Sequence, residues 1–288
     1  MYWIVTDSTI DMPESFAGSY KDFRVVNLTY IIDGQSYVPD GTDAHARSVY
    51  DKMREGKMIT TSQVNSETWK EAFEDILQQG HDILCIAFSS GLSGTYQAAT
   101  VAAEELREKY PERKLEVIDS LAASAGEGLL VYYTLKNREK GMSLAENTAW
   151  IRANVNNVVH WFTVNDLIHL MRGGRVSAVS AYVGTLVKIK PVMHVNEEGK
   201  LIPREKVMGR RKSLRALVDK IKEKIVDPEG QLVTISHGDC EDEARWVGEQ
   251  IKAELPMVDV QISYVGPVIG AHTGPGVVAV FCMGNGKQ

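Results

Sequence analysis

The sequence lacks an excess of positive charge, paired cysteines and long apolar runs. Its 32 Lys and Arg against 38 Asp and Glu give a formal net charge of -6, so we expect no nucleic-acid partner. The three cysteines, Cys85, Cys240 and Cys282, are far apart and form no CxxC pair, which argues against zinc or redox chemistry. The longest apolar stretches are shorter than a membrane span, so we expect no stable membrane insertion.

The first residues also bear on location. Residues 2–5 (YWIV) predict a core strand that leaves no room for a signal peptide. Unpaired thiols suit a reducing compartment. We therefore predict a cytoplasmic protein.

The common nucleotide and nucleophile motifs are missing as well. No Gly-x-Gly-x-x-Gly follows the first predicted strand, and no Gly-x-x-x-x-Gly-Lys-Ser/Thr occurs. Ser93 has Gly91 two residues before it but Thr95 two residues after it, so it is not a nucleophile elbow. No acidic cluster indicates a metal site. We expect no cofactor, no metal and no catalytic residue.

Strands alternate with helices along the whole chain, which predicts an α/β fold. In the first half we expect a mainly parallel sheet, with strands at 2–6, 25–32, 83–88 and 114–118 and helices at 44–55, 66–79, 94–109, 122–140 and 143–154. In the second half a hairpin around 192–207 predicts a mixed sheet, together with helices at 210–226 and 241–254 and strands at 158–164, 231–236 and 258–265. The Asn-rich stretch 154–157 divides the chain into two α/β lobes, 1–157 and 158–288.

The most informative stretch is residues 89–97 (SSGLSGTYQ), which follows a predicted buried strand and opens a predicted helix. Backbone N–H groups at a helix start have no partner within the helix and attract anions. With the hydroxyl of Ser93 and the backbone of Gly94, this turn suits a carboxylate or a phosphate. The alternative is that its Ser and Gly residues only cap the helix.

A second hydroxyl cluster lies at residues 60–63 (TTSQ), which we expect to form a polar loop between two helices. Thr61 and Ser62 could act merely as a helix cap. Paired with Ser93 across a crevice, they would supply the donors that one carboxylate requires, since its two oxygens accept about four hydrogen bonds.

Residues 266–276 (GPVIGAHTGPG) contain four glycines and two prolines, so we expect an irregular, rigid loop. A histidine held in such a loop, His272, is a candidate functional residue, although a lone histidine is usually structural. We expect the other histidines to be exposed or packed, with His237 at a strand end as the reserve candidate.

Two groups of basic residues flank glycines: Arg172 and Arg175 around 173–174, and Arg210 after Gly209. In an acidic protein they suggest a surface for an anionic ligand or an acidic partner, the alternative being ordinary solvated charge. Residues 176–189 predict a helix that is apolar on nearly every face, which is either core or the wall of an apolar slot.

Taken together in chain order, these motifs resemble the DegV family. The segments that carry the resemblance are 4–9 (IVTDST), 61–63 (TSQ), 89–97 (SSGLSGTYQ), 117–120 (VIDS), 173–176 (GGRV), 190–191 (KP), 209–212 (GRRK) and 270–276 (GAHTGPG). The resemblance implies two α/β lobes that bury an acyl chain, and a role as the fatty-acid-binding component of a bacterial fatty acid kinase. It implies that Thr61 or Ser62 and Ser93 hold the carboxylate, with His272 and Arg172 near it. It also implies a partner kinase, similar to dihydroxyacetone kinase, that converts the bound acid into an acyl phosphate.

The sequence-based hypothesis is therefore a non-catalytic protein that binds a long-chain fatty acid and presents its carboxylate for phosphorylation. The expected ligand-binding residues are Thr61, Ser62, Ser93, Gly94 and His272. Arg172, Arg175 and Arg210 are expected at a partner or phosphotransfer surface. Two alternatives stay open: an enzyme of phosphoryl transfer or hydrolysis that uses His272 with Ser93, and a regulator that binds a sugar or another metabolite.

Overall fold

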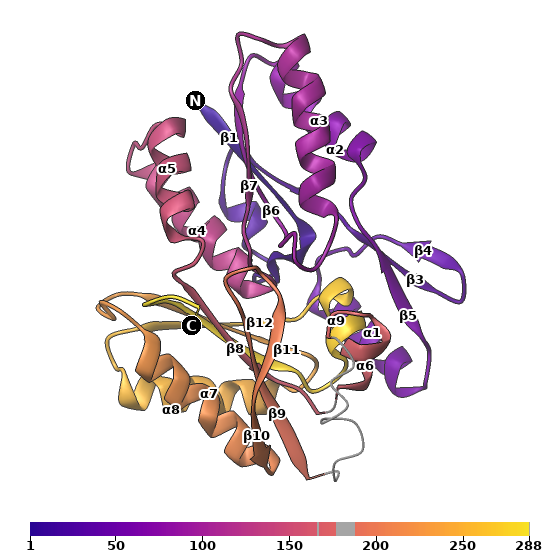
Figure 1. Ribbon diagram of the computed structural model, residues 1–288, viewed down its shortest axis with the longest axis vertical. Helices are drawn as coiled ribbons and strands as arrows, with labels where there is room; N and C mark the ends of the chain where they lie inside the picture. The colour runs from indigo at the N-terminus through magenta and orange to yellow at the C-terminus, as the bar shows by residue number, and fades with distance from the viewer. Residues whose placement is uncertain (166, 177–187, 288) are drawn as a thin grey trace.

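The computed structural model describes residues 1–165, 167–176 and 188–287. Within them the chain forms two α/β lobes, one above the other in Figure 1, with a small third sheet at the side. The expected fold class is confirmed: a parallel sheet in the N-terminal region and a mixed sheet in the C-terminal region. The expected lobe boundary at residue 157 stays a prediction.

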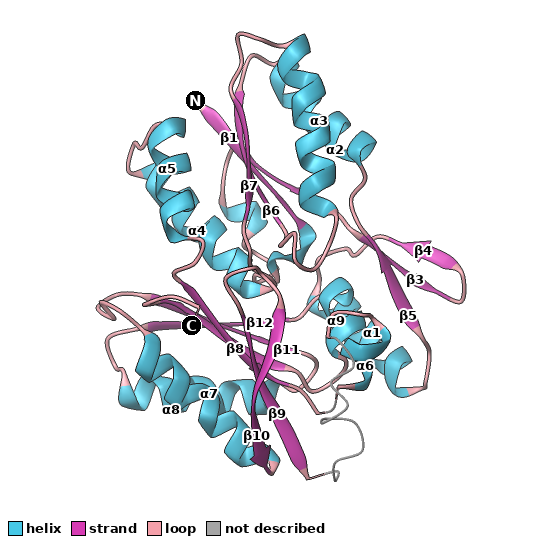
Figure 2. Ribbon diagram, in the orientation of Figure 1, coloured by secondary structure: helices cyan, strands magenta, loops and turns pink. Residues whose placement is uncertain are grey.

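The N-terminal sheet has four parallel strands in the order β2-β1-β6-β7. Helices cover both faces of this sheet (Figure 2). Side chains alternate between the two faces along β1. Val5 therefore packs toward α2 and α3, whereas Ile4 packs toward α4 and α5. The bounds are β1 Tyr2–Asp7, β2 Phe23–Val26, β6 Asp82–Ala87, β7 Leu115–Asp119, α2 Ser66–Gln78, α3 Thr95–Lys109, α4 Ala125–Glu139 and α5 Leu144–Asn154.

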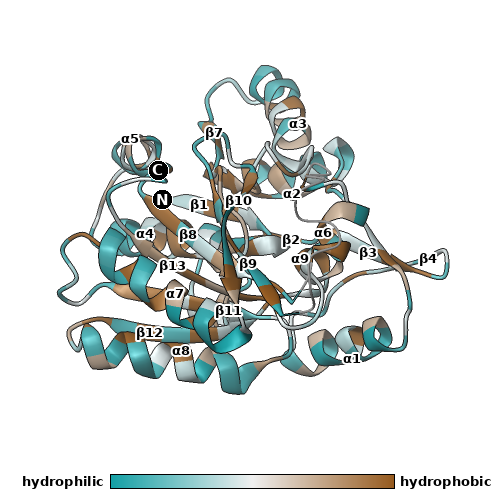
Figure 3. Ribbon diagram, turned by 60° about the horizontal axis from the view of Figure 1, so that its bottom comes forward, coloured by the Kyte–Doolittle hydropathy of each residue, from teal (hydrophilic) through white to brown (hydrophobic). Residues whose placement is uncertain are grey.

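The C-terminal sheet has six strands in the order β10-β9-β8-β13-β11-β12, of which only β11 and β12 pair in parallel. Helices α7 and α8 cover one face through an apolar cluster, and their outward surfaces are hydrophilic (Figure 3). The bounds are β8 Val158–Thr163, β9 Ile189–Val195, β10 Leu201–Met208, β11 Leu232–His237, β12 Asp259–Tyr264, β13 Val278–Met283, α7 Arg210–Lys224 and α8 Glu241–Glu254.

Helix α4 lies between the two sheets and contacts both. Leu129 and Leu130 belong to the cluster that covers the free face of the C-terminal sheet. Val131 and Leu135 belong to the cluster beneath the N-terminal sheet. All four side chains are fully buried, so this one helix serves as a layer of both lobes.

The third sheet, β4-β3-β5, corrects two expectations. The single strand expected at 25–32 is two strands in different sheets, β2 and β3 (Thr29–Ile32), and β3 continues into the hairpin strand β4 (Gln35–Tyr37). The polar loop expected at 60–63 was also wrong, because β5 (Ile59–Ser62) pairs with β3. Ile and Thr are β-branched and favour strands, and this preference outweighs the polarity of the hydroxyls.

The prediction of an irregular loop at 266–276 was wrong for most of that segment, because α9 spans Pro267–Thr273. Proline at the first helical position suits a helix start, and Gly270 lets the helix pack closely on the Tyr50 hydroxyl. The helix is capped at its C-terminus by Gly274, whose φ of 74° favours glycine. Helix α9 packs beside α1 (Asp43–Arg54) and the short α6 (Ile168–Arg172). The apolar helix expected at 176–189 falls mostly on residues 177–187, outside the described residues.

Candidate functional site

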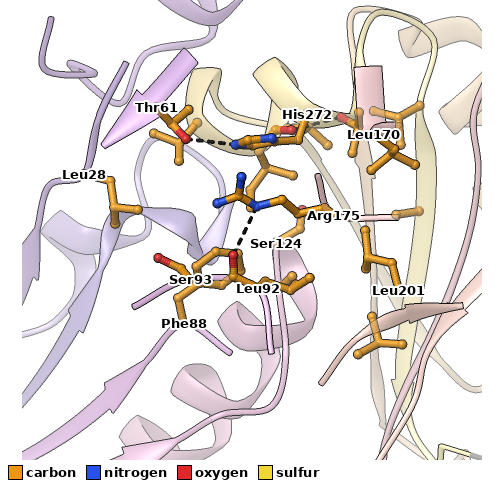
Figure 4. A pocket seen from close by; sticks show the side chains of 18 of the residues that line it. Leu28, Thr61, Phe88, Leu92, Ser93, Ser124, Leu170, Arg175, Leu201 and His272 are labelled. Carbon is orange, nitrogen blue, oxygen red and sulfur yellow. Dashed lines mark hydrogen bonds between the residues drawn. The ribbon is translucent and has the colours of Figure 1, made fainter. Parts of the chain in front are cut away.

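A cavity of about 340 Å3 lies between the two lobes and the third sheet. Figure 4 shows the side chains of Thr61, Ser93, Arg175 and His272 grouped together, with Leu28 on one side of the group and Leu170 and Leu201 on the other. Most of its wall is apolar and comes from both halves of the chain, including Leu28, Phe88, Leu92, Phe162, Leu170, Val195, Leu201 and Phe281. The site is therefore amphipathic, with one concentrated polar region and a remainder that is mostly apolar.

All five residues expected to bind a ligand line this cavity: Thr61, Ser62, Ser93, Gly94 and His272. Three separate elements bring them together. Thr61 and Ser62 end strand β5, Ser93 and Gly94 form the turn into α3, and His272 lies in α9. Thr61 and His272 are 211 residues apart in the chain, so the cluster exists only in the folded protein.

Thr61 and His272 form a direct pair, with 2.8 Å between Thr61 Oγ1 and His272 Nε2. Burial, with the neighbouring Arg175 guanidinium, lowers the pKa of His272 to about 4, so the imidazole is neutral near pH 7. In the tautomer with the proton on Nε2, His272 donates to Thr61 Oγ1, and the Thr61 hydroxyl proton is then directed to another acceptor. In this tautomer the pair offers a donor to an anionic ligand without placing a charge there.

The turn before α3 provides the second part of the polar region. Ser93 Oγ lies 2.9 Å from Thr95 Oγ1 and accepts from the Thr95 N–H at 3.3 Å. Gly94, the N-cap residue of α3, lies so close to the Gln63 side-chain amide that a β-carbon there would collide with it. This close approach joins the end of β5 to the start of α3 and places both hydroxyl clusters on one wall.

Arg175 also lines the cavity, although it was expected only at a partner or phosphotransfer surface. Its Nε donates to the Leu92 carbonyl at 3.1 Å, which ties it to the Ser93 turn (Figure 4). Burial lowers the pKa of Arg175, yet an arginine stays charged under all ordinary conditions. It therefore brings positive charge to the polar region.

Arg172 lies in the wall of a smaller cavity of about 200 Å3 that also includes Thr61, Arg175 and His272. The two cavities thus share one polar wall, and Arg172 is on the far side of it. Arg210 lines neither of these cavities. Its guanidinium bonds to the Glu243 carboxylate and to the Gly276 carbonyl, so its charge is paired within the C-terminal lobe.

Ser124 is a cavity residue that the sequence did not single out. It has φ 55° and ψ -148°, a strained backbone for a residue with a side chain. Its hydroxyl donates to the Asp11 carboxylate at 2.5 Å and lies 2.9 Å from Ser236 Oγ. Asp11 in turn accepts from the Gly266 N–H at 2.8 Å. These bonds hold the strained position and connect the two lobes behind the cavity.

Sequence analysis offered residues 176–189 as either core or an apolar wall, and most of them lie outside the described residues. Within the described residues, the apolar wall comes from ordinary core positions such as Phe162 on β8, Val195 on β9 and Phe281 on β13. A strand residue that faces a cavity has the same sequence pattern as one that faces packed core, so no sequence signal separates the two.

The described residues contain neither a group of His, Cys, Asp and Glu side chains suited to a metal ion nor a helix with the length and apolarity to cross a membrane.

Comparison with known proteins agrees with the fold and the motifs. The model of a family described as "Uncharacterised protein, DegV family" matches residues 2–285. A DegV domain-containing protein of Clostridium perfringens is 43% identical over 287 residues, which cover 99% of this chain and 98% of that protein. A relative from Streptococcus pyogenes serotype M1, also a DegV domain-containing protein, is 36% identical over 288 residues, covering 100% and 99% of the two chains.

Two solved structures are similar over almost their full length. The fatty acid binding DegV family protein of Streptococcus agalactiae is 30% identical with a TM-score of 0.85, covering 99% of both chains. A DegV family protein of Thermus thermophilus is 28% identical with a TM-score of 0.88, again covering 99% of both chains, and its structure is reported for fatty acid binding. The match of the family model over nearly all residues, supported by the close relatives, shows that this chain belongs to the DegV family.

Proposed function

We propose that this protein binds a long-chain fatty acid, with the acyl chain in the apolar part of the cavity and the carboxylate at Thr61, Ser62, Ser93, Gly94 and His272. The observation that carries the proposal is that Thr61, Ser62, Ser93, Gly94 and His272 line one cavity whose wall is otherwise mostly apolar. The fatty acid binding of the similar proteins from Streptococcus agalactiae and Thermus thermophilus supports it.

The two regions have different energetic roles. About fourteen buried methylenes at ~0.8 kcal/mol each contribute on the order of 10 kcal/mol, so the chain dominates the affinity. Each charge-assisted hydrogen bond to the carboxylate adds roughly 1.5–3 kcal/mol. The donors on Thr61 and Ser93 therefore orient the ligand, while the leucine and phenylalanine side chains hold it.

The second part of the proposal concerns what happens to the acid. The protein presents the carboxylate to a partner kinase, similar to dihydroxyacetone kinase, which forms the acyl phosphate. The resemblance to the fatty acid kinase component suggests this partner. The smaller cavity with Arg172 and Arg175, on the other side of the polar wall, suits the negative charge of the transferred phosphoryl group.

A binding role also fits the arrangement of the hydroxyls better than an enzymatic one. A serine nucleophile needs a base within hydrogen-bonding distance. Ser93 Oγ is paired with Thr95, whereas His272 Nε2 is paired with Thr61. Ser93 and His272 are thus engaged with different partners.

Mass spectrometry of organic extracts from the purified protein tests the binding proposal. We expect a long-chain fatty acid in near-stoichiometric amount, and repeated absence of such an acid would contradict it. Incubation of the protein alone with an acyl phosphate tests the enzymatic alternative. Turnover that is lost in His272→Ala would favour that alternative, whereas unchanged acyl phosphate is the expected result.

A further inference from the structure

Ser89, a fully buried residue at the start of the turn that carries Ser93, uses every polar atom it has. Its N–H donates to the Ala122 carbonyl at 3.1 Å, and its carbonyl accepts from the N–H groups of Leu92 and Ser93 at 3.0 and 3.1 Å. Its hydroxyl accepts from the Gly91 N–H at 3.2 Å. The position of Ser93 is therefore set through Ser89.

The remaining bond of Ser89 crosses to the other half of the chain. Its hydroxyl donates to the Gly199 carbonyl at 2.9 Å, and Gly199 lies in the turn between β9 and β10. This turn, residues 196–199, is the tip of the C-terminal hairpin. The hairpin tip thus docks directly on the turn that forms part of the polar region.

The two turns approach each other too closely for side chains at the contact. A β-carbon on Gly91 would lie 2.5 Å from the Glu198 carbonyl oxygen, and one on Gly199 would overlap Ser89 Oγ. Gly199 also has φ 71°, which favours glycine. Neither glycine lines the cavity, so ligand contact does not account for them.

We propose that the tip of the β9–β10 hairpin, through Gly199 and Ser89, is the positioning element of the carboxylate site. Ser89 and Gly199 do not touch the ligand; they fix where the Ser93 hydroxyl and the Gly94 backbone stand relative to Thr61. This inference rests on the proposed fatty acid binding and adds that recognition of the carboxylate depends on a contact made by the other lobe. The acyl chain depends on that contact less: Val195 and Leu201 flank the hairpin tip and line the cavity, but most of the apolar wall comes from other elements.

Comparison of the affinities for a fatty acid and for the alcohol of the same chain length distinguishes the contribution of the carboxylate site from that of the apolar wall. We would measure the dissociation constants of palmitic acid and 1-hexadecanol with delipidated full-length protein, by displacement of a fluorescent fatty acid analogue. The variant is Gly199→Ala, and the matched control is Gly34→Ala. Gly34 also occupies a hairpin turn at positive φ, but a β-carbon there meets nothing within 4 Å, so it carries the backbone strain without the collision.

We expect wild type and Gly34→Ala to prefer the acid over the alcohol by more than about tenfold. In Gly199→Ala we expect this preference to fall by about tenfold, because acid affinity falls more than alcohol affinity. Ser89→Ala removes the connecting hydroxyl without a collision and should lower the acid preference by a smaller factor. This second variant keeps the test decisive if Gly199→Ala does not fold.

Three results would overturn the inference. An unchanged acid preference in both Gly199→Ala and Ser89→Ala would show that the hairpin contact does not position the site. An equal loss of acid and alcohol affinity would show that the hairpin supports the cavity as a whole. If the wild-type protein binds the acid no better than the alcohol, the site does not recognise the carboxylate, and the proposed function is contradicted as well.

Discussion

Replacement of Thr61 by valine tests the contribution of a single hydroxyl group in the polar region. Valine keeps the β-branched shape and suits the strand β5, so the substitution removes the hydroxyl and little else. Thr61 Oγ1 is bonded to His272 Nε2 at 2.8 Å, and in the tautomer described above its proton is directed to the ligand. The variant therefore loses one hydrogen bond to a charged group, and the imidazole loses its partner.

The expected magnitude follows from these losses. One charge-assisted hydrogen bond is worth roughly 1.5–3 kcal/mol, which corresponds to a roughly 10- to 150-fold increase in the dissociation constant of the fatty acid. His272 Nδ1 is already buried without a partner among the described residues, so Thr61→Val leaves both ring nitrogens unpaired. We therefore also expect a modest loss of thermal stability.

Isothermal titration calorimetry of the delipidated protein with palmitic acid measures the first effect, and thermal unfolding measures the second. Thr60→Val is the matched control, because Thr60 is the exposed neighbour on the same strand and does not line the larger cavity. We expect the control to bind like wild type. Wild-type affinity in a folded Thr61→Val would refute the assignment of this hydroxyl to the carboxylate.

Three further predictions concern charge and packing. Arg172→Ala should spare fatty acid binding but weaken phosphorylation by the partner kinase. Arg175 lies in the wall of both cavities, so Arg175→Ala should weaken both binding and phosphorylation. Binding and kinase assays test this, and the same effect of the two substitutions on both activities would contradict it. Burial raises the pKa of Asp11 from 3.8 to about 7, so the stabilisation by the protonated carboxyl is complete below pH 3.8 and is lost as the pH rises through 7. Urea unfolding should therefore show that the free energy of unfolding of Asp11→Asn, relative to that of wild type, is higher at pH 8 than at pH 5. An equal difference at both pH values would contradict this. Gly128→Ala should destabilise by about 1–3 kcal/mol, because its β-carbon would collide with the Ile10 carbonyl and Met12; thermal unfolding should show no such loss for Gly18→Ala, where a β-carbon meets nothing within 4 Å.

The sequence predicted the main elements of both large sheets because their signals are local. Buried strands such as β6 are short apolar runs, and helices such as α2 are amphipathic. The N-cap of α2 is Asn65, whose side chain accepts from the Thr68 N–H. The hairpin of β9 and β10 also followed from its turn residues. These features require no knowledge of distant contacts.

The errors came where a distant partner decides the outcome. Thr60 and Thr61 have a polar, loop-like composition, but pairing with β3 makes them a strand. The glycines of 266–276 indicated an irregular loop, whereas Gly270 serves the packing of α9 on Tyr50. For the site, the hydroxyl motifs directed attention to the right turns, but Ser124 and the apolar wall depend on how the two lobes meet.

The place of helix α4 between the two sheets has a mechanical consequence. Leu129 and Leu130 are packed against one sheet and Val131 and Leu135 against the other, so a hinge motion that separated the sheets would expose apolar surface on at least one side of the helix. Fully exposing even one such leucine costs about 1.5–3 kcal/mol. A long acyl chain is therefore expected to enter the cavity without separation of either sheet from α4.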